Sequence, residues 1–339
     1  MLGHFPDTAG LSVHELPDAG LINRTWSVGV TPRFVIQLVN PVIPEPADER
    51  IDLVTRHVAS RNVPTPLLVR DREERCAVPA AEGGRWRLLT FVPGTTWHRL
   101  PDPRHARSAG ALVGRFHAAL QDLPDPLEPL RLQVHDTPRH TRRLEEILQR
   151  CSDHRLRAGI TGTGEEILRS WERFRTEIAA LDLANRPAHG DLKASNVRFD
   201  PTGEDAVCLV DLDTLGRLPL DAEIGDALRS WCNPLGEDAA SGRVDLDLFA
   251  AAVAGYLAEA TFVEPREREA IVLGMWRISV ELAARFCVDA HQESYFGWNP
   301  RVAPSRGDHN LLRARGQLSL ALDVEARRSE LERLVTAVG

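Results

Sequence analysis

Apolar and polar residues alternate through much of the first ninety positions, with the two-residue period of half-buried strands. Residues 21–28 and 33–39 show this alternation, and further strands are predicted at 67–69, 76–78 and 86–92. Residues 47–61 instead place apolar side chains at helical spacing, which predicts one amphipathic helix within this strand-rich region.

Beyond Pro93-Gly94 the apolar period lengthens to that of helices. A proline-rich connection is expected at 124–138. Helices are predicted at 105–120, 141–149, 165–181, 246–259, 264–289 and 311–335. The pattern therefore predicts an α+β protein with a small β-rich lobe (1–93), a hinge at Pro93-Gly94 and a larger, mainly helical lobe (94–339).

One β-hairpin interrupts the helical region. Residues 197–199 and 206–212 flank the turn Asp200-Pro201-Thr202-Gly203, which has the composition of a hairpin connection. If Phe199 faces Ala206, the register places Asp211 within a residue or two of Asn196 across the ladder.

The stretch His189-Gly190-Asp191-Leu192-Lys193 precedes this hairpin and carries the strongest chemical signal. An ionised Asp191 can accept a hydrogen bond from an attacking hydroxyl and take its proton late. Asn196 and Asp211 offer hard oxygen ligands that can share one Mg²⁺. Of the 41 lysine and arginine residues, Lys193 is the sole lysine, and its ammonium could offset charge on a transferred phosphoryl group. The set points to metal-assisted phosphoryl transfer.

Composition limits the partners of such a site. The net charge of -8 argues against a nucleic-acid binder and requires local neutralisation of nucleotide phosphates. Five scattered cysteines without C-x-x-C spacing favour a reduced, cytoplasmic chain. Residues 1–10 lack the features of a signal peptide, and the apolar run 248–258 is too short to span a bilayer. The expected partners are a nucleotide and a small hydroxylated substrate, with no nucleic acid and no membrane.

The pattern H-G-D-x-x-x-x-N, followed by a strand ending in Asp, resembles the aminoglycoside phosphotransferase and choline kinase superfamily. That resemblance implies a bilobal protein-kinase-like fold and an ATP-dependent, Mg²⁺-requiring kinase. It further implies that Asp191 is the catalytic base, that Asn196 and Asp211 are the Mg²⁺ ligands, and that His189 braces the loop.

Shorter stretches resemble the N-acetylhexosamine anomeric kinases. They are 20–23 with Thr25, 34–40, Arg285-Phe286, Asp289, Tyr295-Phe296, 309–311, 313–315 and Gln317. This likeness implies transfer of the γ-phosphate of ATP to the hydroxyl of an amino sugar. Candidate substrate contacts are Asp213, Arg285, Tyr295, His309 and Arg313, although surface placement or helix pairing explains each one taken alone. Asp213 is equally expected to bind metal through water or to be a solvated strand end.

The nucleotide side departs from the wider kinase pattern. Gln37 stands where most kinases place a phosphate-holding lysine, so an arginine or the metal must anchor the phosphates. With one glycine in place of G-x-G-x-x-G, backbone N–H groups near Gly20 and the side chains of Asn23 and Thr25 are expected to cap them. Adenine is expected to bind main-chain groups of Phe91 or Val92, because Pro93 has no N–H.

Two alternatives remain open at this stage. An aminoglycoside or choline-type kinase needs an acidic pocket for its cationic substrate, for which Glu237, Asp238, Asp245 and Asp247 are candidates. A catalytically silent nucleotide- or sugar-binding pseudokinase would account for the missing strand lysine and glycine-rich loop. Asp226 is expected to be a helix N-cap.

Overall fold

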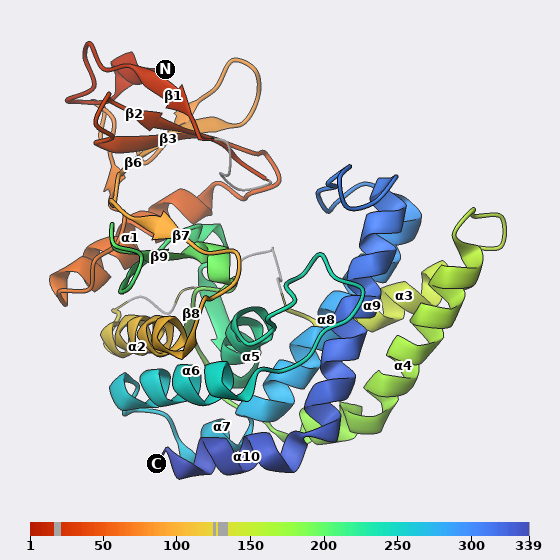
Figure 1. Ribbon diagram of the computed structural model, residues 1–339. Coiled ribbons are helices and arrows are strands. Elements are labelled where there is room, and N and C mark those ends of the chain that lie inside the picture. Colours follow the sequence, from red (N-terminus) through yellow and green to blue (C-terminus); the bar gives the residue numbers. More distant parts are fainter. Residues whose placement is uncertain (17–21, 125–126, 128–134, 339) are drawn as a thin grey trace.

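The computed structural model describes residues 1–16, 22–124, 127 and 135–338. The predicted α+β architecture is confirmed, with a twisted sheet in the N-terminal part and a larger helical body beneath it (Figure 1). Gly20 lies outside the described residues, so its predicted role has no structural counterpart here. None of the helices in the described ranges has the length and apolar content needed to cross a bilayer.

The N-terminal sheet is antiparallel in the order β1-β2-β3-β6-β4, and β5 pairs with β6. Its strands are β1 (Val13–Glu15), β2 (Arg24–Val28), β3 (Phe34–Val39), β4 (Leu68–Val69), β5 (Val78–Pro79) and β6 (Arg85–Thr90). Ile36 and Leu88 contribute to an apolar core on one face. The other face carries Gln37 and Arg87 and turns toward helix α1 (Pro46–Ser60).

A second sheet has three strands in the order β10-β9-β7. It contains β7 (Thr95–Thr96), β9 (Val197–Phe199) and β10 (Ala206–Leu209). Phe199 faces Ala206 as predicted, and the register shifts before Cys208. Gly94 has φ +141°, and a β-carbon there would lie 1.8 Å from the Phe199 carbonyl oxygen. The chain therefore needs glycine at this junction both for its backbone conformation and for its close approach to β9.

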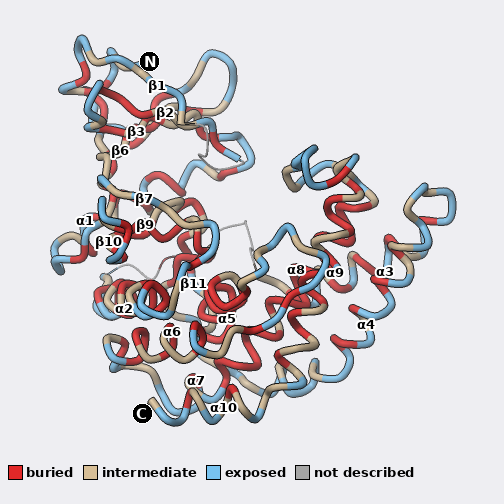
Figure 2. The backbone as a smooth tube through the Cα atoms, in the orientation of Figure 1, coloured by how far each residue is buried: buried red, intermediate tan, exposed pale blue. Residues whose placement is uncertain are grey.

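The helical body is built around α8, which is red along most of its length in Figure 2 because nearly every residue is buried. It packs against α3, α4, α5 and α9, while α2 packs against α6. The bounds are α2 (Pro103–Ala119), α3 (Thr137–Leu148), α4 (Arg157–Ala180), α5 (Leu220–Trp231), α6 (Leu246–Glu259), α7 (Pro265–Glu269), α8 (Ile271–Gln292), α9 (Arg306–Ala326) and α10 (Arg328–Ala337), with the strand pair β8 (Asn185–Ala188) and β11 (Gly216–Pro219).

Several predicted boundaries were wrong. The terminal helix expected at 311–335 is two helices separated at Arg327, and α7 forms a short helix ahead of α8. Helix α3 starts at Thr137, so Pro138 belongs to its first turn and not to the preceding connection. Proline is tolerated there because the missing N–H has no intrahelical partner, and Asp136 caps the turn by accepting from the Arg139 N–H at 3.1 Å.

Candidate active site

The loop between β8 and β9 is fixed by the buried His189 side chain. Its Nε2 lies 3.0 Å from the Val210 carbonyl oxygen, and the Asp191 N–H donates to its Nδ1 at 3.3 Å. Because Nδ1 accepts this hydrogen bond, Nε2 is the ring nitrogen that donates to the Val210 carbonyl oxygen. Gly190 has φ +83° and passes close to the Thr214 carbonyl, which makes the tight turn possible. His189 thus braces the loop against the strand that leads to Asp211.

Helix α5 supports the same loop from below. Three of its side chains, spaced three and four residues apart and therefore on one face, accept hydrogen bonds from loop N–H groups. Glu223 accepts from His189 (2.7 Å) and Gly190 (3.0 Å), Asp226 from Leu192 (2.8 Å) and Ser230 from Ala194 (3.0 Å). Because Asp226 lies inside α5 and not at its start, the predicted N-cap role is wrong. Sequence reasoning expected a helix to begin at Asp226 and missed both its true start at Leu220 and its support of the loop, although acids three residues apart in an apolar segment were a usable signal.

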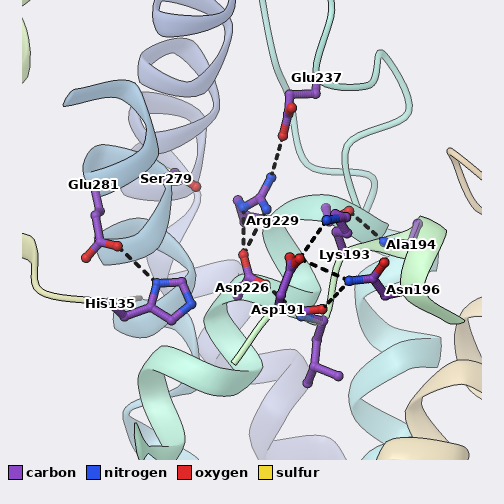
Figure 3. A network of polar contacts seen from close by, with 12 residues as sticks. His135, Asp191, Lys193, Ala194, Asn196, Asp226, Arg229, Glu237, Ser279 and Glu281 are labelled. Carbon is purple, nitrogen blue, oxygen red and sulfur yellow. Dashed lines mark hydrogen bonds and ion pairs between the residues drawn. The ribbon is translucent and has the colours of Figure 1, made fainter. Parts of the chain in front are cut away.

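Asp191, Lys193 and Asn196 converge at the end of this loop (Figure 3). The Lys193 ammonium donates to Asp191 Oδ2 at 2.6 Å, and the Asn196 amide donates to Asp191 Oδ2 at 3.0 Å and to its carbonyl at 2.9 Å. Burial opposes ionisation of Asp191, but the charge and hydrogen bond of Lys193 outweigh it and lower the Asp191 pKa. The Asp191 carboxyl is therefore ionised at neutral pH.

Asp211 follows β10 and adopts the left-handed conformation, with φ +65°. Such strain in a non-glycine residue is typical of functional sites. Burial raises the pKa of Asp211, Lys193 at 3.9 Å opposes this, and the charges of Asp191 and Asp213 add to it. A further cation beside Asp211 would relieve this repulsion. The described residues contain no cluster of three or more His, Cys, Asp or Glu suited to a metal, but Mg²⁺ commonly takes few protein ligands alongside waters and phosphates. The Asn196 amide oxygen and the Asp211 carboxylate fit that requirement.

The candidate phosphate-capping side chains are already engaged with one another. Asn23 donates to Asp213 at 2.5 Å and accepts from the Asn40 N–H at 2.9 Å, while Gln37 donates to Thr25 at 3.2 Å. Asp213 is buried and does not end a strand in solvent, so that alternative is wrong. Its carboxylate accepts hydrogen bonds from Asn23 and Arg87 of the N-terminal region, which argues against a direct substrate contact.

Arg87 links these groups and was missed by sequence reasoning. It donates from Nε to Gln37 at 2.8 Å and from its terminal nitrogens to Asp213 and to Asp48 of α1. No local pattern points to Arg87, because its acidic partners lie 39 and 126 residues away in the chain.

At the predicted adenine-binding segment, the Phe91 N–H already donates to the Arg33 carbonyl at 2.9 Å. The Val92 carbonyl accepts from Arg198 at 2.5 Å. Phe91 is therefore unsuited as the donor to adenine, and the Val92 N–H stays as the candidate.

On the other side of Asp226, α8 carries a second group of polar residues (Figure 3). Glu281 accepts from His135 at 3.0 Å and from Thr137 at 2.7 Å. The charges of Asp226 and Arg285 both act on the pKa of His135, so these groups are near neighbours. Arg285 lies over Phe296 (5.5 Å) and Tyr295 (5.9 Å) without an ion pair or hydrogen bond to any described residue.

His309 and Arg313 have internal partners instead. Arg313 donates to Asp238 at 2.6 Å and to the Gly297 carbonyl at 2.8 Å, and His309 Nε2 lies 3.0 Å from Asp238. His309 is fully buried. Both side chains hold the segment around Asp238 against α9, and neither is positioned to contact a substrate without breaking these bonds.

Three of the four acids considered for a cationic substrate have partners within the protein, and the fourth, Asp247, is exposed in the first turn of α6. Asp238 pairs with Arg313, Glu237 pairs with Arg229, and Asp245 caps α6 by accepting from the N–H groups of its first turn. These three acids are neutralised or used within the protein.

Comparison with known proteins finds one family model that matches most of the chain. Residues 14–267 match the model of the phosphotransferase enzyme family. A curated homoserine kinase from Acidiphilium cryptum is 31% identical over 191 residues, which span 53% of each chain. The matched region is thus about half of that relative.

Solved structures share the fold over nearly the whole chain. A choline/ethanolamine kinase family protein from Mesorhizobium loti has a TM-score of 0.60 at 16% identity, covering 98% of this chain and 94% of its own. A microcompartment-associated aminopropanol kinase has a TM-score of 0.63 at 16% identity, covering 98% and 96%. An aminoglycoside phosphotransferase from Alicyclobacillus acidocaldarius has a TM-score of 0.60 at 18% identity, covering 99% and 95%. With three quarters of its length matched to the family model and a phosphotransferase-like loop in place, the chain belongs to the phosphotransferase enzyme family.

Proposed function

We propose that the protein is an ATP- and Mg²⁺-dependent kinase that transfers the γ-phosphoryl group to a hydroxyl of an amino sugar or N-acetylhexosamine. The observation that carries the proposal is the convergence of Asp191, Lys193, Asn196 and Asp211 at the ends of two adjacent segments. An ionised carboxylate, one ammonium and two hard oxygen ligands are the groups that phosphoryl transfer requires.

The four side chains divide the work. Asp191 orients the acceptor hydroxyl and takes its proton late in the reaction, for which its lowered pKa keeps it ionised. Asn196 and Asp211 would hold Mg²⁺, which when bound offsets phosphate charge. Lys193 rests on Asp191 and can turn toward the transferred phosphoryl group, because its aliphatic stem is flexible and its head is partly exposed. Asp191 and Asn196 are held in position because α5 and His189 hold the loop that carries them by hydrogen bonds.

Arg285 and Tyr295 support the choice of a sugar acceptor. Tyr295 is 61% exposed and presents an aromatic face, and the Arg285 guanidinium above it has donors without partners in the described part of the chain. Sugar sites combine an aromatic surface with convergent polar groups. The ion pairs of Glu237 with Arg229 and of Asp238 with Arg313 also disfavour aminoglycosides and choline, which are cations.

A second acceptor, homoserine, is favoured by the 31% identity to a homoserine kinase over half of the chain. The Arg285 guanidinium, which has no hydrogen-bond partner among the described residues, could hold its carboxylate by a bidentate pair. Replacement of Arg285 by Lys would then weaken homoserine binding more than sugar binding, because lysine keeps the charge but loses the fork.

The test is incubation with ATP-Mg²⁺ and separate panels of N-acetylhexosamines, amino sugars, homoserine, aminoglycosides and choline, with ADP release as the readout. Turnover of hexosamines supports the proposal, and turnover of homoserine alone supports the second acceptor. Nucleotide binding without turnover of any acceptor would contradict the proposal and support the pseudokinase alternative.

Asp191→Ala should abolish transfer and leave nucleotide binding largely intact. Asp211→Ala should change the Mg²⁺ requirement, and the exposed Asp205 of the same hairpin supplies the matched control, Asp205→Ala. An unchanged Mg²⁺ requirement in Asp211→Ala would refute the ligand assignment.

A further inference from the structure

Position 37, on the second strand, is a glutamine where most kinases have a lysine, and nothing in the active-site loop replaces that lysine on the strand. That lysine forms an ion pair with an acid on the helix packed against the sheet, and the pair must be in place for activity. Gln37 carries no charge, and Lys193 lies in a different segment, on the catalytic loop.

The register of the sheet supplies a cation at the neighbouring position. Gln37 on β3 faces Arg87 on β6 directly, so both side chains leave the same face of the sheet. Arg87 is 1% exposed and its Nε donates to Gln37 at 2.8 Å. The positive charge expected on β3 is thus present one strand away.

Arg87 also makes the contacts expected of that charge. Its Nη1 donates to Asp48 of α1 at 3.2 Å and to Asp213, and its Nη2 donates to the second Asp213 oxygen at 3.0 Å. Asn23 donates to Asp213 as well. We call Asn23, Gln37, Asp48, Arg87 and Asp213 the Arg87 network.

The Arg87 network reaches the metal ligand through the chain itself. Asp213 lies two residues after Asp211, and Thr214 donates to the His189 carbonyl at 2.7 Å. The segment 211–214 is therefore fastened to the sheet at one residue and to the catalytic loop at the next. Because Asp211 holds a strained left-handed conformation, its orientation depends on how firmly this segment is held.

From these contacts we infer that Arg87 performs, from β6, the positioning task of the missing strand lysine: it joins the sheet, α1 and segment 211–214, and so holds Asp211 in place for a Mg²⁺-nucleotide. The inference rests on the proposed function for the identity of the ligand. Arg87 is a positioning residue here, since it acts through Asp213 and Asp211.

The chain offers a matched control on the same strand. Arg85 leaves the same face, is buried, and pairs with the same Asp48, but its other donors go to the Ile43 carbonyl (2.9 Å) and the Pro44 carbonyl (3.0 Å). Arg85→Met therefore removes a buried arginine and the Asp48 contact while leaving Asp213 untouched.

The experiment measures binding of Mg²⁺ with a non-hydrolysable ATP analogue by calorimetry, together with thermal unfolding of each variant. Arg87→Met should weaken Mg²⁺-nucleotide binding at least tenfold and raise the Mg²⁺ concentration for half-maximal binding, whereas Arg85→Met should change both less than threefold. The double variant Arg87→Met/Gln37→Lys should recover most of the affinity, because a lysine at 37 starts directly opposite the lost guanidinium. Asp213→Asn, which keeps the shape of the side chain, should reproduce the Arg87→Met effect if that variant folds poorly.

Equal losses in Arg87→Met and Arg85→Met, or wild-type Mg²⁺-nucleotide affinity in Arg87→Met or in Asp213→Asn, would overturn the inference. The binding readout is separate from turnover. A wild-type protein that binds Mg²⁺-nucleotide but phosphorylates no acceptor refutes the proposed function alone, and one that binds no Mg²⁺-nucleotide overturns both.

Discussion

Replacing Lys193 with methionine removes the only lysine side chain of the protein from between Asp191 and Asp211. Its Nζ lies 2.6 Å from Asp191 and 3.9 Å from Asp211, and the side chain is 40% exposed. An ion pair with that exposure contributes about 0.2–1 kcal/mol to folding. Lys193→Met should therefore change the free energy of unfolding little.

The effect on catalysis should be much larger. A charged donor aimed at the transferred group stabilises a transition state by about 2.7–4 kcal/mol, which corresponds to roughly a hundred- to a thousandfold in kcat. No second lysine exists to compensate. Lys193→Arg keeps the charge and should recover part of the rate.

The pH profile supplies an independent readout. Burial of Asp191 favours its neutral form, and Lys193 is what lowers its pKa below the ordinary value. Without Lys193 the pKa of Asp191 rises, so the acid limb of kcat/KM should move to higher pH. The wild-type acid limb should lie at lower pH, because transfer needs the ionised carboxylate.

The assay is ADP release with the acceptor identified in the panel, measured across the pH range for wild type, Lys193→Met and Arg143→Met. Arg143 is the matched control because it also forms a 2.6 Å ion pair, with Glu146, at 41% exposure. Arg143→Met should cost similar stability and leave kcat unchanged. A fall in kcat of less than about tenfold in Lys193→Met, with the acid limb at its wild-type position, would refute the reasoning.

Three further predictions concern the fold. Gly94→Ala should destabilise the protein by several kcal/mol more than Gly83→Ala. Both glycines have positive φ, but a β-carbon at position 94 would lie 1.8 Å from a carbonyl oxygen, whereas one at position 83 would have no atom within 4 Å. Equal unfolding midpoints of the two variants in urea would contradict this. Burial opposes ionisation of Glu281, but the His135 hydrogen bond prevails and lowers the Glu281 pKa to about 2. The Glu281 carboxylate therefore stabilises the protein above the ordinary carboxyl pKa, and this contribution is lost as pH falls toward 2. Glu281→Gln should flatten that acid decline in thermal melts and cost on the order of 1–3 kcal/mol at neutral pH, and an unchanged decline would count against the Glu281–His135 pair. The five cysteines are free and buried, so Ellman's reagent should label none of them until the protein is unfolded, and rapid labelling of the folded protein would contradict the packing.

Local features were predicted well because their causes are local. Helix α6 has the predicted bounds, since a 3.6-residue apolar period and an Asp cap act within a few positions. The pairing of Phe199 with Ala206 follows from the length and composition of one turn. The spacing likewise predicted that Asp191, Lys193 and Asn196 lie together, and in the structure they share hydrogen bonds.

The tertiary structure decided which of the other polar residues belong to the site. Asp213, His309 and Arg313 have sequence contexts that fit a substrate pocket, yet each is engaged by groups brought from elsewhere in the chain. The tertiary structure also decided that helix α5 supports the loop 189–196, because this loop crosses the face of α5 that carries Glu223 and Asp226.

The sequence by itself thus determined the α+β class, most of the elements and the absence of a lysine at position 37, and it predicted a catalytic role for the loop around Asp191. The structure alone placed Arg87 beside Gln37 and joined it to Asp48 and Asp213. The physical reason is that a strand's periodicity is set by its own backbone, whereas its cross-strand neighbour is set by sheet topology and register, which place Arg87 against acids 39 and 126 residues away in the chain.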